Sequence, residues 1–286
     1  MNIRPVTAVD RVIRSRLRET VAFPHLSERR ALRLSAIEHY TARAHFVRWH
    51  RILGSPDFTG LTGIFSPLVY VELETTDAPC EPEERLAVTG ESYLGRTLDV
   101  HGETRHLARH GTYRLAALDG SPVGSARLVN VFTRYDPDPA LRRVRELPDE
   151  TGLGGVPSRI VDLPAVEDLA PLDRRPDFAE SDVHAWHYGQ TDPNRHVNGI
   201  EYLRTMEQYF ADMLYGREQD LTRLWAARAR VLYRKPCFRG EGYRRVAWFT
   251  GEAPLAMCGA FFKADDSPRA RPAAVVELTY QLHEEC

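Results

Sequence analysis

The sequence predicts an α+β protein made of two copies of one unit, in which a long helix is followed by an antiparallel sheet. Three observations lead to this prediction. Helical periodicity begins near residue 35 and again near residue 198, and β-rich runs follow each helix. Short matches between the two halves recur in the same order along the chain. A segment rich in Pro, Asp, Glu and Arg, residues 136–175, has the composition of a connector between the copies.

The first helix is predicted from four apolar residues at helical spacing, which are Ile37, Tyr40, Ala44 and Val47. Ser35 and Glu38 have the spacing of a capping box at its start, and Gly54 stands where a glycine would end it. Upstream, residues 1–22 fit either a short helix or the entry into a first strand.

The second helix is predicted to begin at Asn198, a good N-cap residue, with Glu201 in the reciprocal position of a capping box. Gly216 stands at its end. Its apolar face comprises Ile200, Leu203, Met206, Phe210 and Met213.

The β-rich runs define the domain organisation. In the first copy they are residues 64–73, 85–93, 97–105, 111–118 and 125–135. In the second copy they are residues 227–233, 243–251, 256–263 and 273–283. We therefore predict an N-terminal domain at 1–135, a linker at 136–178 and a C-terminal domain at 179–286.

A fixed shift relates the two copies. Ile37 matches Ile200, and 200 − 37 = 163, while Tyr70 and Tyr233 are also 163 residues apart. The shift becomes smaller later in the chain, which indicates shorter hairpins in the second copy. Such a duplication predicts that edge strands of the two sheets pair with each other and leave no exposed edge between them.

The loop before the second helix concentrates polar groups that can carry chemistry. Asp192, Asn194 and His196 alternate in a Pro-containing loop, and the predicted helix begins directly afterwards. The first backbone N–H groups of a helix have no intrahelical partner and carry the positive end of its dipole. Those near Asn198 and Gly199 could therefore bind an oxyanion, and glycine allows close approach of a carbonyl.

A structural explanation of this loop remains open. Asp-Pro-Asn is an ordinary turn sequence, so Asp192 and Asn198 could serve only as turn and capping residues. In the first copy, subtracting 163 places Arg29, Ala31 and Arg33 at the positions of the three polar residues. We therefore expect the first copy to be inactive.

The pattern Asp-x-Asn-x-His-Val-Asn-x-x-x-Tyr at 192–202 resembles the signature of hotdog-fold acyl-thioesterases, and it is most similar to that of the double-hotdog acyl-acyl carrier protein thioesterases. The resemblance implies a tandem hotdog, in which two helix-wrapped antiparallel sheets join as a pseudo-dimer. It also implies that Asp192, Asn194 and His196 belong to the active site.

Two positions depart from the family pattern. Gly199 stands where the family usually has a second Asn. Cys237 matches a Cys of the plant enzymes, but Pro236 stands where their Glu precedes it. A further acidic catalytic residue is therefore not carried over, and Cys237 is expected to be a buried small hydrophobe rather than a nucleophile.

Hydrolysis of an acyl-acyl carrier protein or acyl-CoA thioester is the predicted activity. Asp192 would act either as general base for a water or as nucleophile, with Asn194 or His196 fixing the water or the carbonyl. Tyr202 is a candidate to line the acyl pocket, although an aromatic at helical spacing is more often core. The alternatives are dehydration, cyclisation or acyl transfer on a carrier-bound chain, and a scaffold protein that binds thioesters without turnover.

Composition excludes several other classes. The 38 basic and 40 acidic residues give a net charge of −2, so neither nucleic acid nor an anionic membrane is an expected partner. The four cysteines include no C-x-x-C pair, and no apolar run reaches about 20 residues. We expect a cytoplasmic protein without metal or cofactor, in which a homodimer remains possible.

A group of basic residues could bind substrate phosphates or form a solvated strand face. The group comprises Arg228, Arg230, Arg234, Lys235, Arg239, Arg244 and Arg245.

Overall fold

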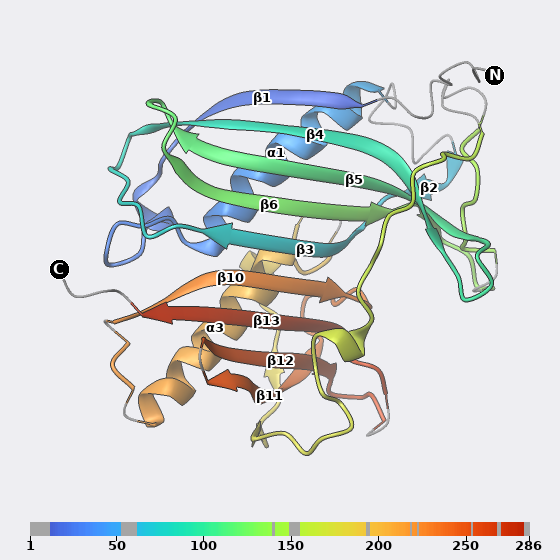
Figure 1. The fold of residues 1–286 in the computed structure, drawn as a ribbon. Helices are drawn as coiled ribbons and strands as arrows, with labels where there is room; N and C mark the ends of the chain where they lie inside the picture. The colour runs from blue at the N-terminus through green and yellow to red at the C-terminus, as the bar shows by residue number, and fades with distance from the viewer. Residues whose placement is uncertain are drawn as a thin grey trace.

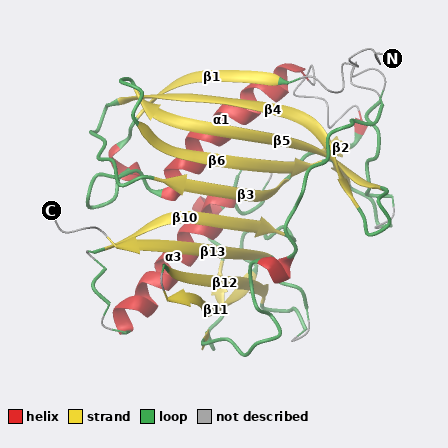
Figure 2. Cartoon of the chain, in the orientation of Figure 1, coloured by secondary structure: helices red, strands yellow, loops and turns green. Residues whose placement is uncertain are grey.

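The computed structural model describes residues 12–52, 62–138, 141–148, 155–192, 195–217, 219–221, 223–252, 254–267 and 270–282. Within these residues one antiparallel sheet extends from the N-terminal to the C-terminal half, with both long helices on the same face (Figures 1 and 2). None of the helices in this part of the chain combines the length and apolar character needed to cross a membrane.

The strand order in the main sheet is β1-β4-β5-β6-β3-β10-β13-β12-β11-β8, and β9 pairs with β11. The N-terminal strands are β1 (Ile13–Thr20), β3 (Leu68–Thr75), β4 (Arg85–Leu98), β5 (Thr104–Ala117) and β6 (Pro122–Val131), with the small pair β2 (Ile64–Phe65) and β7 (Thr133–Arg134) beside them. The C-terminal strands are β8 (Phe178–Ala179), β9 (His184–Ala185), β10 (Leu224–Tyr233), β11 (Gly242–Glu252), β12 (Leu255–Lys263) and β13 (Ala274–Leu282).

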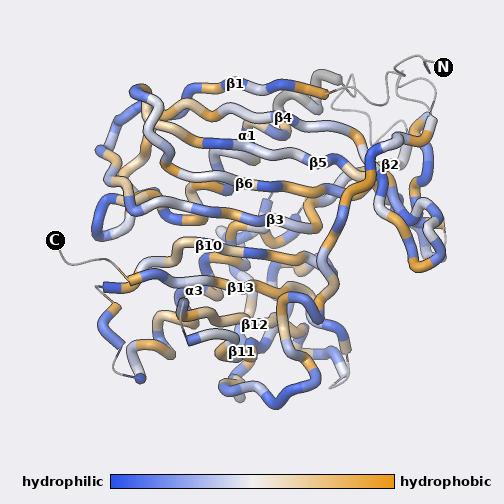
Figure 3. The backbone as a smooth tube through the Cα atoms, in the orientation of Figure 1, coloured by the Kyte–Doolittle hydropathy of each residue, from blue (hydrophilic) through white to orange (hydrophobic). Residues whose placement is uncertain are grey.

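Most predicted strands are confirmed, and the main difference lies in the first copy. The runs predicted at 85–93 and 97–105 are not two strands, because β4 continues without a break to Leu98 and turns back into β5. Leu86 and Val88 of β4 are buried, whereas Thr89 and Glu91 farther along the strand are exposed, as in a strand with one face on the core. Figure 3 shows polar and apolar residues mixed along these strands.

Helix α3 (Gly199–Gly216) confirms the predicted N-cap but not the capping box. The Asn198 Oδ1 accepts a hydrogen bond from the Ile200 N–H at 3.2 Å. The Asn198 N–H donates to the Gln190 carbonyl at 2.8 Å instead of to Glu201, whose carboxylate pairs with Arg204 at 2.9 Å. Because that N–H already has a backbone partner, the reciprocal bond from Glu201 is not formed.

Helix α1 (Leu34–Ile52) also starts differently from the prediction. The Ala36 and Ile37 N–H groups both donate to the Arg33 carbonyl, at 2.9 and 3.2 Å, so Arg33 occupies the cap position and Ser35 lies inside the helix. The predicted capping box of Ser35 and Glu38 is therefore wrong, and the Glu38 side chain is buried. The predicted terminating Gly54 lies outside the described residues.

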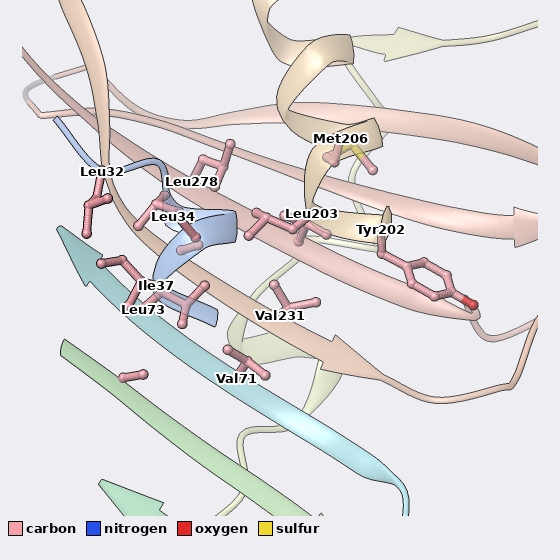
Figure 4. Close-up of a cluster of buried hydrophobic side chains, with 14 of the residues drawn as sticks. Leu32, Leu34, Ile37, Val71, Leu73, Tyr202, Leu203, Met206, Val231 and Leu278 are labelled. Carbon is pink, nitrogen blue, oxygen red and sulfur yellow. The ribbon is translucent and has the colours of Figure 1, made fainter. Parts of the chain in front are cut away.

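The two halves join where β3 pairs with β10. Val71 lies opposite Val231 in this antiparallel ladder, as the duplication predicted for the edge strands. Beneath the junction the halves share one apolar core, in which Ile37 of α1 and Leu203 of α3 lie near the same two valines (Figure 4). On the outer face, Arg228 of β10 pairs with Glu72 of β3.

The connector crosses the outer face of the joined sheet (Figure 1). The connector contains the short helix η4 (Val166–Asp168). It buries Val161, Val166 and Leu169 against residues of both halves, including Tyr70 and Leu232. The connector therefore covers the apolar outer side of the junction. The predicted domain limits at 135 and 179 stay a prediction.

The structure corrects the register of the duplication. Around the start of each helix the backbone repeats with a shift of 165, because α1 begins at Leu34 and α3 at Gly199, and 199 − 34 = 165. The same shift relates the left-handed residues Arg30 and Arg195, with φ of 65° and 67°. The 163-residue shift expected from sequence is therefore two residues out in this region.

We predict that Leu203→Ala lowers the free energy of unfolding by about 2–5 kcal/mol, because it leaves a cavity in the core shared by the two halves. The control Leu118→Ala, in an exposed turn, should change it by no more than about 0.5 kcal/mol. Chemical denaturation followed by circular dichroism measures both. Equal effects of the two substitutions would contradict the shared core.

Candidate functional site

The described parts of the motif loop, residues 188–192 and 195–198, are held together by backbone hydrogen bonds. The short helix η5 (Tyr188–Gln190) leads into it, and Thr191 forms a bridge with Val197. The Asp192 N–H donates to the His196 carbonyl at 2.8 Å, and the Arg195 N–H donates to the Asp192 carbonyl at 2.9 Å. The loop therefore presents its side chains from a defined backbone.

The Asp192 carboxylate takes part in this turn. Its Oδ1 accepts a hydrogen bond from the His196 N–H at 3.2 Å, and the residue is half-buried. The turn-forming role considered from the sequence is thus present, and the carboxylate also remains partly open to solvent. Asn194 lies outside the described residues.

The loop is anchored to the chain that follows β10. The Val197 N–H donates to the Cys237 carbonyl at 2.8 Å, and His196 forms a bridge with Phe238. The His196 ring meets the Phe238 ring nearly edge-on, with centroids 4.9 Å apart. This packing holds the imidazole against Phe238.

The first turn of α3 offers one unused donor. Asn198 accepts the N–H groups of Ile200 and Glu201, through its side chain and its carbonyl respectively. The Gly199 N–H makes no hydrogen bond within the described chain. A helix-start N–H without a partner is the kind of group that can bind a developing oxyanion.

Gly199 is closely enclosed on its other side. A Cβ at this position would lie 3.0 Å from the Tyr233 hydroxyl oxygen and 3.2 Å from Oε1 of Glu38. The Tyr233 hydroxyl donates to the Gly199 carbonyl at 3.1 Å. Glycine at 199, where the family pattern has Asn, therefore gives these two groups room against the helix start.

Glu38 is a functional candidate that the sequence analysis did not identify. Its side chain comes from α1 in the N-terminal half, the residue is 2% exposed, and its Oε2 has no hydrogen-bond partner in the described structure. Burial raises the pKa of Glu38 to about 8, although the hydrogen bond with Tyr233 and the charge of Arg204 act in the opposite direction. The sequence alone did not mark it, because the shift of 165 that aligns Glu38 with the buried Leu203 (38 + 165 = 203) comes from the structure.

Tyr202 lies in the core beside the loop. It is 3% exposed, and its ring packs against Trp186 and Phe261 with centroids 4.9 and 5.4 Å apart. Its hydroxyl is hydrogen-bonded to the Cys237 thiol, and burial raises the pKa of both groups. Cys237 is therefore held as a thiol, which agrees with a packing role.

The basic group of β10 and its neighbours is largely neutralised by carboxylates. Arg230 donates to Glu277 at 2.8 Å, Lys235 pairs with Asp266 at 2.9 Å, and Arg245 donates to Glu180 at 2.8 Å. These pairs favour the structural role of the group over phosphate binding. Within the described residues no cluster of His, Cys, Asp and Glu has an arrangement that could hold a metal ion.

An open groove of about 760 Å³ lies on the outer face of the N-terminal strands. Its lining combines Arg14, Arg114 and Arg127 with glutamates such as Glu72 and Glu91. No residue of the motif loop contributes to it, so this groove is separate from the candidate site.

The first copy contains the same turn without the same chemistry. The Ser27 N–H donates to the Ala31 carbonyl at 2.8 Å, as the Asp192 N–H does to His196, and 192 − 27 = 165. The positions equivalent to Asp192, Asn194 and His196 are thus Ser27, Arg29 and Ala31. They replace Arg29, Ala31 and Arg33 of the sequence alignment, and the first copy still lacks carboxylate, amide and imidazole.

Comparison with known proteins supports the fold. No family model and no curated protein matches the sequence. An acyl-ACP thioesterase from Bacteroides thetaiotaomicron is similar in structure, with TM-score 0.65, 13% identity and coverage of 94% of this chain and 98% of that chain. A putative oleoyl thioesterase from Lactobacillus plantarum has TM-score 0.70 and 14% identity, with coverage of 97% and 99%. The 12:0-ACP thioesterase from Umbellularia californica has TM-score 0.67 and 13% identity, with 94% of each chain covered.

These three structures share the fold over nearly the whole chain. The resemblance to double-hotdog acyl-acyl carrier protein thioesterases, stated from the loop motif, is confirmed for the fold. The comparison supports one architecture. It is a large antiparallel sheet that extends through both halves and carries two long helices.

We predict that stability decreases as pH rises from about 5 to about 8, because the folded state keeps a proton on Glu38 over this range and the unfolded state does not. The folded-state pKa of about 8 lies above the ordinary value of 4.5, so the stabilisation is complete below 4.5 and is lost as pH approaches 8. In Glu38→Gln this part of the pH dependence should disappear, which unfolding curves at several pH values measure.

Glu38→Leu serves as the control for packing. Both variants lack the ionisable group, so both should lose the same pH dependence even if their absolute stabilities differ. Retention of the wild-type pH dependence in either variant would contradict the assignment.

Proposed function

We propose that this chain hydrolyses acyl thioesters, and that its substrate is an acyl-acyl carrier protein or acyl-CoA. The supporting observation is the position of the Asp192 turn directly before a helix whose first N–H, that of Gly199, has no partner in the described chain. The fold shared with acyl-ACP and oleoyl thioesterases supports the same conclusion.

In this proposal the two copies form a covalently linked pseudo-dimer with one active site. The C-terminal copy supplies Asp192, Asn194 and His196, whereas the equivalent turn of the N-terminal copy has none of these groups. The β3–β10 pairing and the shared core support this arrangement, since they join the halves as edge strands of one sheet.

The chemistry assigned to the site follows from its groups. Asp192 would take a proton from an attacking water, or attack the carbonyl itself to give an anhydride that water then cleaves. His196 and Asn194 would hold the water or the carbonyl. The Gly199 N–H would stabilise the oxyanion of the tetrahedral intermediate, a contribution of about 3 kcal/mol for one donor.

We expect Asp192→Asn to lower kcat for thioester cleavage by about 100-fold or more, because the amide can neither accept the proton nor attack. Its hydrogen bond from the His196 N–H can persist, since the amide oxygen accepts as the carboxylate does. The melting temperature should therefore stay close to that of wild type. Release of free thiol from short, long and aromatic acyl thioesters, on both carrier protein and coenzyme A, measures the activity.

Ser27→Ala is the matched control, because Ser27 occupies the same position in the turn of the first copy. It should leave thiol release unchanged. Binding of a thioester without turnover by the wild type would favour the scaffold alternative. A modified acyl group that remains thioester-bound would favour a biosynthetic enzyme that acts on a carrier-bound chain.

A further inference from the structure

Glu38 reaches the candidate site from the opposite half of the molecule. It is the fifth residue of α1, and its Oε1 lies 3.2 Å from where a Cβ on Gly199 would stand. Gly199 is the residue that begins α3 and carries the proposed oxyanion donor. The carboxyl therefore lies against the first turn of α3 although 161 residues separate Glu38 and Gly199 in the chain (199 − 38 = 161).

Only one side of the Glu38 carboxyl has a hydrogen-bond partner within the described residues. The Tyr233 hydroxyl is hydrogen-bonded to it and also donates to the Gly199 carbonyl at 3.1 Å. The other oxygen, Oε2, has no partner within the described residues, although the residue is 98% buried, since its exposed fraction is 2%. A buried oxygen left without a hydrogen bond is destabilising, and such groups are uncommon in folded proteins.

Packing alone does not account for a glutamate here. The equivalent residue of the sister helix is Leu203, which is fully buried in the apolar core. A leucine at 38 would fill similar space without an unsatisfied polar group. The charged groups that face Glu38 are few: Arg204 on α3 acts on it through its charge, and Tyr233 at the end of β10 is a neutral partner.

We infer that Glu38 is a second carboxyl of the thioester site, contributed by the N-terminal half, and that it gives its proton to the sulfur of the departing thiol. This inference rests on the proposed thioesterase function. It assigns Asp192 and Glu38 opposite tasks, since Asp192 receives a proton and Glu38 donates one.

The proposed steps balance. Water adds to the carbonyl carbon, a C–O bond forms, and Asp192 takes the proton that the water loses. The tetrahedral intermediate then collapses, the C–S bond breaks with its electron pair on sulfur, and the Glu38 proton moves to that sulfur. Asp192 afterwards returns its proton to solvent and Glu38 takes one from solvent, so that the net reaction is water plus thioester to acid plus thiol.

The test compares two thioesters of the same acyl group with the full-length protein. An N-acetylcysteamine ester has an alkyl thiol that leaves poorly as an anion, whereas a 4-nitrothiophenyl ester has a thiol that leaves easily without a proton. Glu38→Gln should lower kcat for the alkyl ester by about 100-fold and leave kcat for the aryl ester nearly unchanged. Asp192→Asn should impair both esters.

The pH profile provides a second readout. For the alkyl ester, wild-type kcat should fall as pH rises through about 8, because Glu38 must carry its proton to donate it. This alkaline decrease should be absent in Glu38→Gln. A role limited to packing would move neither the pH profile nor the difference between the two esters.

Glu207→Gln is the matched control. Glu207 is also a helical carboxyl whose pKa burial raises, but it lies eight residues beyond Gly199 along α3, since 207 − 199 = 8, or about 12 Å along the axis. Its kcat and pH profile should match wild type. Glu38→Leu, which introduces the residue of the sister helix, should fold at least as stably as wild type and lose alkyl-ester turnover.

The outcomes separate this inference from the proposed function. If wild type cleaves neither ester, the thioesterase proposal is wrong, and with it the role of Glu38. If Asp192→Asn is inactive while Glu38→Gln or Glu38→Leu keeps full alkyl-ester turnover, thioester hydrolysis stands and the proton-donor role of Glu38 is rejected. Equal losses on both esters in Glu38→Gln would also reject it.

Discussion

The antiparallel pairing of β3 with β10 is the contact on which the rest of the structure depends. It aligns residues 70–74 with residues 228–232 and makes one sheet from the two halves. With α1 and α3 on the same face, their first turns meet beneath this junction. Glu38 of one half and Gly199 of the other are neighbours for this reason, and residues from both halves contribute to the candidate site.

The two turns that precede the helices show how backbone and side-chain chemistry separate. Both place an Arg in the left-handed region and both close with a bridge between residues on either side of it. Their hydrogen bonds are the same pair by pair, yet one turn carries Asp192 and His196 and the other Ser27 and Ala31. Since the backbone closes the turn through its own N–H and carbonyl groups, the side chains could diverge without loss of the loop.

The side chains of the two helices also differ at equivalent positions, where α1 has Glu38 and α3 has Leu203. Replacing a core leucine by a glutamate buries an ionisable group, and burial favours its protonated form. Tyr233 satisfies one side of the carboxyl and holds the start of α3 at the same time. The geometry thus connects the protonation state of a residue in the N-terminal half to the helix start that bears the proposed oxyanion donor.

The sequence by itself determined the repeated helix-and-sheet plan, the start of α3 at Asn198, and the loop that carries Asp192 and His196. These features depend on local patterns: alternation along strands, apolar spacing along helices, and the capping preference of asparagine. Tertiary structure decided the register of the duplication, because a shift of 163 or 165 cannot be distinguished from a few matching letters, whereas hydrogen bonds fix it. It also decided the surroundings of Glu38. Sequence spacing favoured a local cap for that carboxyl, and its contact with Gly199 and Tyr233 arises only when strands distant in the chain pair and carry the two helices together.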